Sequence, residues 1–170
     1  PRFTSYTYSN LIDAWLSGIY LGLPLSLALR IRMLPDGAAW FLLVLLGVAA
    51  ADIFAYFIGS WLGKTPLAPR ISPHKTWEGL AGGGVGCLVV LAVMNVLLHN
   101  PLAWWGLLAL GLVLTACDIT GDLAASVPKR AAGVKNYGRL IPGHGGLLDR
   151  IDGILFALPF AYVLIAFVLI

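Results

Sequence analysis

The stretch AAWFLLVLLGVAAADIFAYFIG, Ala38 to Gly59, decides the fold of this chain, because it is apolar over a membrane-spanning length and carries one acidic residue, Asp52. A helix needs about 20 consecutive apolar residues to cross the ~30 Å hydrocarbon core of a bilayer. The whole chain shares this character: 59% of its residues are hydrophobic, 11% are charged and the mean hydropathy is +0.88. These values favour an integral membrane protein over a soluble domain.

Four other stretches are apolar enough to span a bilayer. Together they give five predicted transmembrane helices, at residues 11–29, 38–59, 80–98, 102–126 and 153–170. The predicted fold class is all-α, a polytopic membrane helix bundle, with two polar loops that form the site. We expect one membrane-embedded domain over residues 1–170. The chain begins with Pro1 and has no cleavable signal pattern, so we also expect that it lacks N-terminal helices of a longer protein.

Positive charge is concentrated in two loops, the one after the second predicted span and the one after the fourth. Nine of the eleven basic residues lie in these loops or near the N-terminus, and two, Arg30 and Arg32, lie at the other side. The positive-inside rule therefore predicts that both long loops face the cytoplasm, in a multi-pass protein of the bacterial cytoplasmic membrane. This location of the charges also argues against nucleic acid as a partner.

Acidic residues lie within or at the ends of the predicted spans: Asp52, Asp118, Asp122, Asp149 and Asp152. A charged group in hydrocarbon costs several kcal/mol, so such residues usually face a polar cavity and often serve function. Asp118 and Asp122 share one helical face, and Asp149 and Asp152 share another. If the two faces meet, three or four carboxylates converge, and Mg²⁺ is the natural neutraliser because oxygen ligands favour a hard cation.

The stretch IPGHGGLLDRID, Ile141 to Asp152, indicates phosphate binding. Glycines that precede a helix, here Gly143, Gly145 and Gly146, expose backbone N–H groups to an anion. His144 is a candidate donor to a phosphate or to a leaving oxygen. Together with the basic residues nearby, this stretch is typical of a polyphosphate site.

Basic and hydroxyl side chains from both loops extend this predicted site. The first loop supplies Lys75 with the hydroxyls of Ser72 and Thr76, and the second supplies Lys129 and Arg130. Such groups make charge-assisted contacts with phosphate oxygens. Simpler roles are open for each residue taken alone.

Three such simpler roles can be stated. An aspartate can cap a helix or pair with Arg130 or Arg150, and the basic residues can anchor the chain to anionic lipid. The HGG sequence can be an ordinary turn into a helix. Cys87 and Cys117 lie in apolar runs without metal-ligand spacing, so we predict that both are core residues.

Several separated blocks closely resemble the signature of phosphatidate cytidylyltransferases, also called CDP-diacylglycerol synthases. The longest is SVPKRAAGVKNYGRLIPGHGGLLDRID, Ser126 to Asp152. Upstream blocks, in the same order as in the family, are DIFAYFIG at 52–59, LAPRISPHKTWEGLAGG at 67–83 and GDL at 121–123. The resemblance covers roughly residues 50–155.

This resemblance implies an integral membrane enzyme that joins CTP to phosphatidic acid and releases pyrophosphate and CDP-diacylglycerol. It implies Mg²⁺, with K⁺ beside it left open, and assigns Asp122 and Asp149 as metal ligands. It also identifies five further polar signature positions, which we take as catalytic candidates: Lys75, Lys129, Arg130, His144 and Asp152. The partners implied are CTP, phosphatidic acid and the bilayer, and a homodimer is left open.

Two departures from the family pattern remove an anion near the proposed site. Ala125 stands where the family usually has Glu, and Asn136 stands where it usually has Asp. A divergent relative with low activity, or one that uses another lipid phosphate, is therefore an alternative. A second alternative is an ion-coupled transporter whose buried carboxylates bind the transported cation. A CDP-alcohol phosphotransferase is disfavoured because its D-G-x-x-A-R block is absent.

Overall fold

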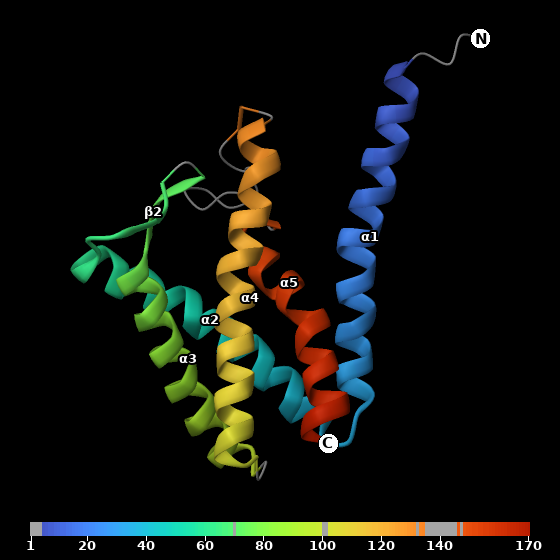
Figure 1. The fold of residues 1–170 in the computed structure, drawn as a ribbon. Helices are drawn as coiled ribbons and strands as arrows, with labels where there is room; N and C mark the ends of the chain where they lie inside the picture. Colours follow the sequence, from blue (N-terminus) through green and yellow to red (C-terminus); the bar gives the residue numbers. More distant parts are fainter. Residues whose placement is uncertain (1–4, 70, 100–101, 132, 135–145, 147) are drawn as a thin grey trace.

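The computed structural model describes residues 5–69, 71–99, 102–131, 133–134, 146 and 148–170 (Figure 1). This part of the chain forms five α-helices: α1 (Ser5–Met33), α2 (Gly37–Leu62), α3 (Trp77–Leu97), α4 (Trp104–Ala131) and α5 (Leu148–Leu164). Helix α5 continues into a short π-helical segment, η1 (Ile165–Leu169). The predicted all-α class is confirmed.

The first polar loop contains secondary structure that the sequence did not predict. Strands β1 (Pro66–Ala68) and β2 (Ser72–Thr76) pair antiparallel and form a hairpin between α2 and α3. The second polar loop is also shorter than expected, because α4 continues to Ala131 and includes Lys129 and Arg130 in its last turn. Lys129 and Arg130, at the end of α4, and Lys75, in β2, therefore lie in regular secondary structure and not in loops.

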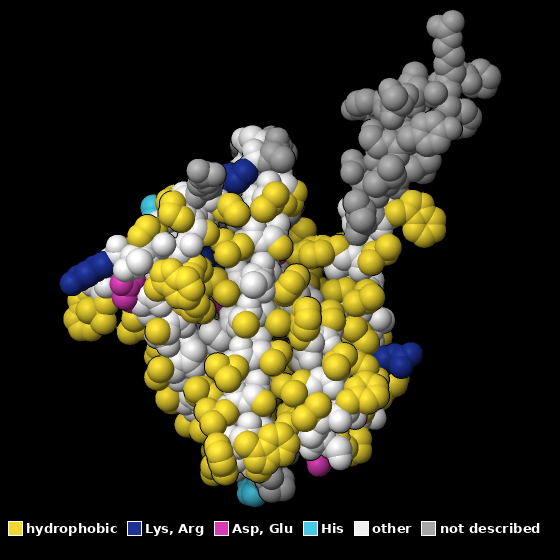
Figure 2. All heavy atoms as spheres, viewed as in Figure 1, with side chains coloured by type: hydrophobic (Ala, Val, Ile, Leu, Met, Phe, Trp, Pro, Cys, Tyr) yellow, Lys and Arg dark blue, Asp and Glu magenta, His cyan; other side chains and the backbone are white. Residues whose placement is uncertain are grey.

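The surface of the bundle is suited to a lipid environment. Within the described residues, four helices are long and apolar enough to cross a membrane: Gly37–Leu62, Trp77–Leu97, Trp104–Arg130 and Ile151–Leu169. Many of their large hydrophobic side chains are exposed, and the face in Figure 2 is largely hydrophobic. Four of the predicted spans are thus supported. The fifth, 11–29, lies inside α1, and its crossing of the membrane stays a prediction.

Helices α2 and α3 make the most extensive helix contact in the structure. Small residues allow this close approach: a Cβ on Gly79 would lie 2.8 Å from the Ala55 carbonyl oxygen, and one on Gly83 would lie 2.7 Å from that of Ala51. Small residues at four-residue spacing are a common device for packing helices in membranes. The contact fixes the start of α3, and with it the hairpin, against the end of α2.

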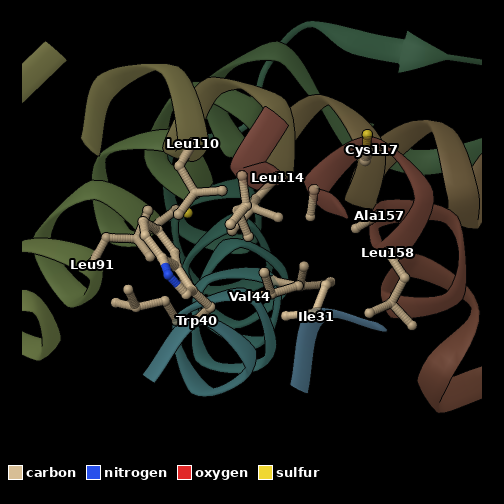
Figure 3. Close-up of a cluster of buried hydrophobic side chains, with 14 of the residues drawn as sticks. Ile31, Trp40, Val44, Leu91, Leu110, Leu114, Cys117, Ala157 and Leu158 are labelled. Atoms are coloured by element: carbon tan, nitrogen blue, oxygen red, sulfur yellow. The ribbon is translucent and has the colours of Figure 1, made fainter. Parts of the chain in front are cut away.

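The hydrophobic core lies in the half of the bundle away from the hairpin. Figure 3 shows side chains from all five helices meeting there, among them Ile31, Trp40, Leu91, Leu114 and Leu158. Cys87 and Cys117 belong to this cluster as free thiols, as predicted. In Figure 1 the hairpin and the end of α4 lie at the opposite end of the bundle from the α1–α2 turn and the C-terminus. This arrangement agrees with two polar connections on one side.

Candidate active site

Helix α4 carries one acidic face toward the first polar connection. Asp118 is buried, and Asp122, one turn further along, is partly exposed. The Asp122 Oδ2 atom lies 2.6 Å from Nζ of Lys75, which comes from β2. The hairpin therefore delivers a lysine to an acid that lies far away in the sequence.

Helix α5 presents its acids to the end of α4. Asp149 lies in the first turn of α5, where its Oδ2 accepts a hydrogen bond from the Gly146 backbone N–H at 2.9 Å. Its Oδ1 accepts a hydrogen bond from Lys129 Nζ at 3.0 Å, and the two side chains are 9% and 8% exposed. This buried ion pair joins the end of α4 to the start of α5.

Asp152 completes the acidic face of α5. Its Oδ1 accepts a hydrogen bond from the Gly153 N–H at 2.9 Å, and its Oδ2 lies 3.9 Å from Lys129 Nζ. The Oδ2 atom is buried and has no hydrogen-bond partner among the described residues. A buried carboxylate oxygen without a donor is costly unless a cation or water satisfies it.

Glycines let the two acidic faces meet. A Cβ on Gly121 would lie 3.2 Å from the Gly153 Cα, so α4 and α5 cross closely at these two residues. A Cβ on Gly153 would collide with Oδ1 of Asp118. Asp118 therefore occupies the space that a side chain at position 153 would fill, next to Asp152. The two acidic faces therefore meet, which is the condition under which their carboxylates converge.

Two adjoining cavities open around these residues. The larger, about 720 Å³, is lined by five carboxylates, those of Asp52, Asp118, Asp122, Asp149 and Asp152, together with Lys129. The smaller, about 530 Å³, lies beside the hairpin and is lined by Ser60, Ser72, His74, Lys75 and Thr76. Asp52, Tyr56 and Asp122 line both cavities. One cavity is thus rich in acids, and the other combines a lysine with hydroxyl groups.

The carboxylate oxygens of the acidic cavity are suitable ligands for a hard cation such as Mg²⁺. In the described residues, however, they are not arranged as a formed metal site. No group of three His, Cys, Asp or Glu side chains in that part of the chain is arranged to hold a metal ion. The two predicted ligands instead face lysines, Asp122 facing Lys75 and Asp149 facing Lys129. Carboxylate oxygens are nevertheless the ligands that Mg²⁺ prefers. One of them, the buried Oδ2 of Asp152, has no hydrogen-bond partner among the described residues.

The structure separates the other sequence-predicted residues into four groups. Ser72 and Thr76 line the smaller cavity, but Thr76 Oγ1 also accepts a hydrogen bond from Gly79 N–H and caps α3. Gly146 directs its N–H to Asp149, not to an open anion site. Arg130 is exposed and lines neither cavity. Candidates outside the described residues are His144, Gly143 and Gly145.

The sequence did not connect two lining residues, Asp52 and Tyr56, with the site. Asp52 and Asp118 stood out as acids inside spans, yet the spacing alone did not connect Asp52 on α2 with α4 and α5. Tyr56 lies one helical turn after Asp52, so both face the same cavities. The sequence signal for Asp52 and Tyr56 is an acidic residue within an apolar run, followed four residues later by a tyrosine.

Comparison with known proteins places these residues in a family. A family model described as the cytidylyltransferase family matches residues 2–168. The chain is similar to the phosphatidate cytidylyltransferase of Bacillus subtilis, with 38% identity over 163 residues, 95% of this chain and 61% of the relative. It is also similar to proteins of that name from Brucella abortus, 40% identical over 162 residues, and Thermotoga maritima, 42% identical over 132 residues.

The match covers much of this chain but less of its relatives. The Brucella abortus alignment takes in 90% of this chain and 60% of the relative, and the Thermotoga maritima alignment 75% and 49%. The chain thus spans between about half and three fifths of the length of these relatives. Since the family model extends over nearly the whole chain, the chain belongs to the cytidylyltransferase family.

Proposed function

We propose that this protein transfers a cytidylyl group from CTP to phosphatidic acid, which gives CDP-diacylglycerol and pyrophosphate. The observation that carries the proposal is the pair of lysine–carboxylate contacts, Lys75 with Asp122 and Lys129 with Asp149, around two adjoining cavities. Lysines bind phosphate oxygens, and clustered carboxylates bind the cation that accompanies a nucleoside triphosphate. Membership of the cytidylyltransferase family and the names of the relatives support the same reaction.

In the proposed reaction an oxygen of the lipid phosphate attacks the α-phosphorus of CTP. The bond between that phosphorus and the oxygen bridging to the β-phosphate breaks, and pyrophosphate leaves with the electron pair. A phosphate monoester is mostly anionic at neutral pH, with a second pKa near ~6, so no strong general base is required. Catalysis then depends on positioning and on neutralising negative charge.

The described side chains divide these tasks. Lys75, with Ser72 in the smaller cavity, is suited to hold phosphate oxygens on the hairpin side. Lys129 is suited to contact phosphates in the larger cavity, where it already faces Asp149 and Asp152. Each lysine would have to exchange a carboxylate partner for a phosphate.

Asp122 and Asp149 would hold Mg²⁺ in the acidic cavity, together with the Oδ2 of Asp152, which has no hydrogen-bond partner among the described residues. When bound, the ion would supply positive charge that offsets the negative charge of the phosphates and of the leaving group. Without positive charge beyond the two lysines, five carboxylates around one cavity would repel an anionic nucleotide.

The location of the site fits two substrates of different solubility. Its cavities lie at the end of an apolar bundle, between four helices that can span a bilayer. Phosphatidic acid would reach it from the lipid phase, and CTP would arrive from the water phase. By the positive-inside rule that phase is the cytoplasm of a bacterial cell.

The direct test is pyrophosphate release from CTP by the purified protein in detergent micelles, with and without phosphatidic acid. We expect release that requires the lipid, and a loss of at least about 100-fold in Asp122→Asn and Asp149→Asn. Asp36→Asn is the matched control, because Asp36 lies in the α1–α2 turn, outside both cavities. Full activity in either site variant, or release that ignores the lipid, would contradict the proposal.

A further inference from the structure

The hairpin that carries Lys75 is tied at its entry by one carboxylate. Glu78 Oε2 accepts hydrogen bonds from the backbone N–H groups of Lys64 and Thr65, each at 3.2 Å. Glu78 Oε1 accepts a third from Oγ1 of Thr65 at 2.9 Å. One side chain in the first turn of α3 thus binds the segment that leaves α2.

The exit of the hairpin is held at the same place. The Trp77 N–H donates to the Thr65 carbonyl oxygen at 3.0 Å, so Thr65 is bonded to the start of α3 through both its backbone groups and its hydroxyl. Thr76 pairs with Pro66 in the strand register and caps α3 through Gly79 N–H. Lys75 immediately precedes Thr76, so its backbone lies next to these fixed points.

The hairpin needs this tie because it is small. Strand β1 has three residues and β2 has five, and the register is irregular between Pro66 and Ala68. A two-stranded hairpin of this size is marginally stable by itself. Hydrogen bonds to a charged acceptor are stronger than neutral ones, so a carboxylate with three donors is an effective clamp.

We propose that Glu78 is a positioning residue that aims Lys75 at the site through this clamp. Glu78 lines neither cavity, whereas Lys75 lines the smaller cavity and contacts Asp122. The inference rests on the proposed function for its catalytic consequence. A misplacement of about 1 Å in a positioning group can reduce a rate by about 100-fold.

A double-mutant cycle tests the catalytic part. Glu78→Gln keeps the shape of the side chain but removes the charged acceptor, and Thr65→Val removes one donor. We expect each to lower kcat by about 10-fold or more, while Thr65→Ser, which keeps the hydroxyl, and Asp36→Asn stay within about twofold of wild type. Unchanged kcat in Glu78→Gln would overturn the proposal.

The cycle also separates positioning from a general loss of structure. In a Lys75→Met background, Glu78→Gln should add less than about a twofold loss, because the group that it positions is gone. In an Arg130→Met background, which changes an exposed residue outside both cavities, Glu78→Gln should keep its full effect. Equal losses in both backgrounds would mean that Glu78 acts on the whole fold, and would overturn the assignment to Lys75.

A distance measurement tests the clamp without any turnover. Spin labels on Pro69→Cys, directly after β1, and Ala124→Cys, on α4, report the position of the hairpin, and both positions are exposed. The buried Cys87 and Cys117 are replaced by alanine in the labelled protein. We expect a narrow distance distribution when residues 65 and 78 are unchanged and in Thr65→Ser, and a broader one in Glu78→Gln and Thr65→Val. A distribution that stays narrow in Glu78→Gln overturns the clamp.

The two measurements keep the two proposals apart. If the distribution broadens as expected but the wild-type protein shows no phosphatidate-dependent release of pyrophosphate, the proposed reaction is wrong and the structural clamp is supported. If turnover is present and the distribution and kcat of Glu78→Gln are both unchanged, the reaction is supported and the clamp is wrong.

Discussion

Lys129 and Asp149 form a buried ion pair across the junction of α4 and α5, with 3.0 Å between Nζ and Oδ1 and less than a tenth of either side chain exposed. Lys75 and Asp122 are closer, at 2.6 Å, but are 19% and 35% exposed. The same chemical pairing therefore occurs in two environments. The difference predicts different consequences for stability and for activity.

Removing one partner of the buried pair should destabilise the protein. We expect Lys129→Met to lower the free energy of unfolding by about 3 kcal/mol or more, because Asp149 then remains buried without its lysine. The double variant Lys129→Met/Asp149→Asn should recover most of this loss. Thermal unfolding in detergent measures both, with the exposed Lys64→Met as control. A single variant as stable as wild type would contradict the prediction.

Removing the more exposed pair should affect activity more than stability. We expect Lys75→Met to change the free energy of unfolding by about 1 kcal/mol or less, because water screens a partly exposed pair. Its kcat/KM for CTP should fall by at least about 100-fold if Lys75 holds a phosphate. Parallel unfolding and turnover measurements check this; a large loss of stability with little loss of turnover would reverse the assignment.

The close crossing of α4 and α5 makes Gly153 sensitive to substitution. Gly153→Ala would place a methyl group against Oδ1 of Asp118, so we expect a loss of about 1–3 kcal/mol in stability and a drop in activity. Gly18→Ala on α1 is the control, because a Cβ there meets nothing within 4 Å. Thermal unfolding of both variants measures this difference in stability. Equal stability would mean that the crossing is looser than the structure describes.

Divalent metal should bind the acidic cavity through α4 and α5. We expect chelation with EDTA to abolish turnover, and Mn²⁺, followed by its paramagnetic resonance signal, to bind the wild-type protein. Asp149→Asn should weaken that binding by about 10-fold or more, while Asp36→Asn should leave it unchanged. Identical Mn²⁺ binding in the Asp149 variant would remove this residue from the proposed ligand set.

Much of the fold follows from local sequence features. The four supported spans are predominantly apolar, and hydropathy along one segment can be read without knowing which other segments it contacts. The hairpin between α2 and α3 was missed because β1 and β2 have only three and five residues. The hydrogen bonds to Glu78, which lies outside both strands, are also not visible in the sequence of either strand. The length of α4 was underestimated because its last turn is polar and contains Pro128.

The chemical character of the site was also predictable. Asp122, Asp149, Asp152, Lys75 and Lys129 were identified from their type and position, since charges at the ends of apolar helices need a polar partner. The structure brings all five to the two cavities. Arg130 lies outside both cavities. Helix α4 continues to Ala131, and Arg130 in its last turn is exposed, which the sequence did not predict.

By itself, the sequence determined that the chain is a helical membrane bundle and that acids at helical spacing share a face, because both properties depend on residues within one helix. Tertiary structure alone decided that Lys75 meets Asp122, that Lys129 meets Asp149, and that Asp52 joins them from α2. These contacts depend on where helices cross, and the crossings are set by close packing at glycines such as Gly79 and Gly153. A crossing is a relation between distant segments, which no single segment encodes.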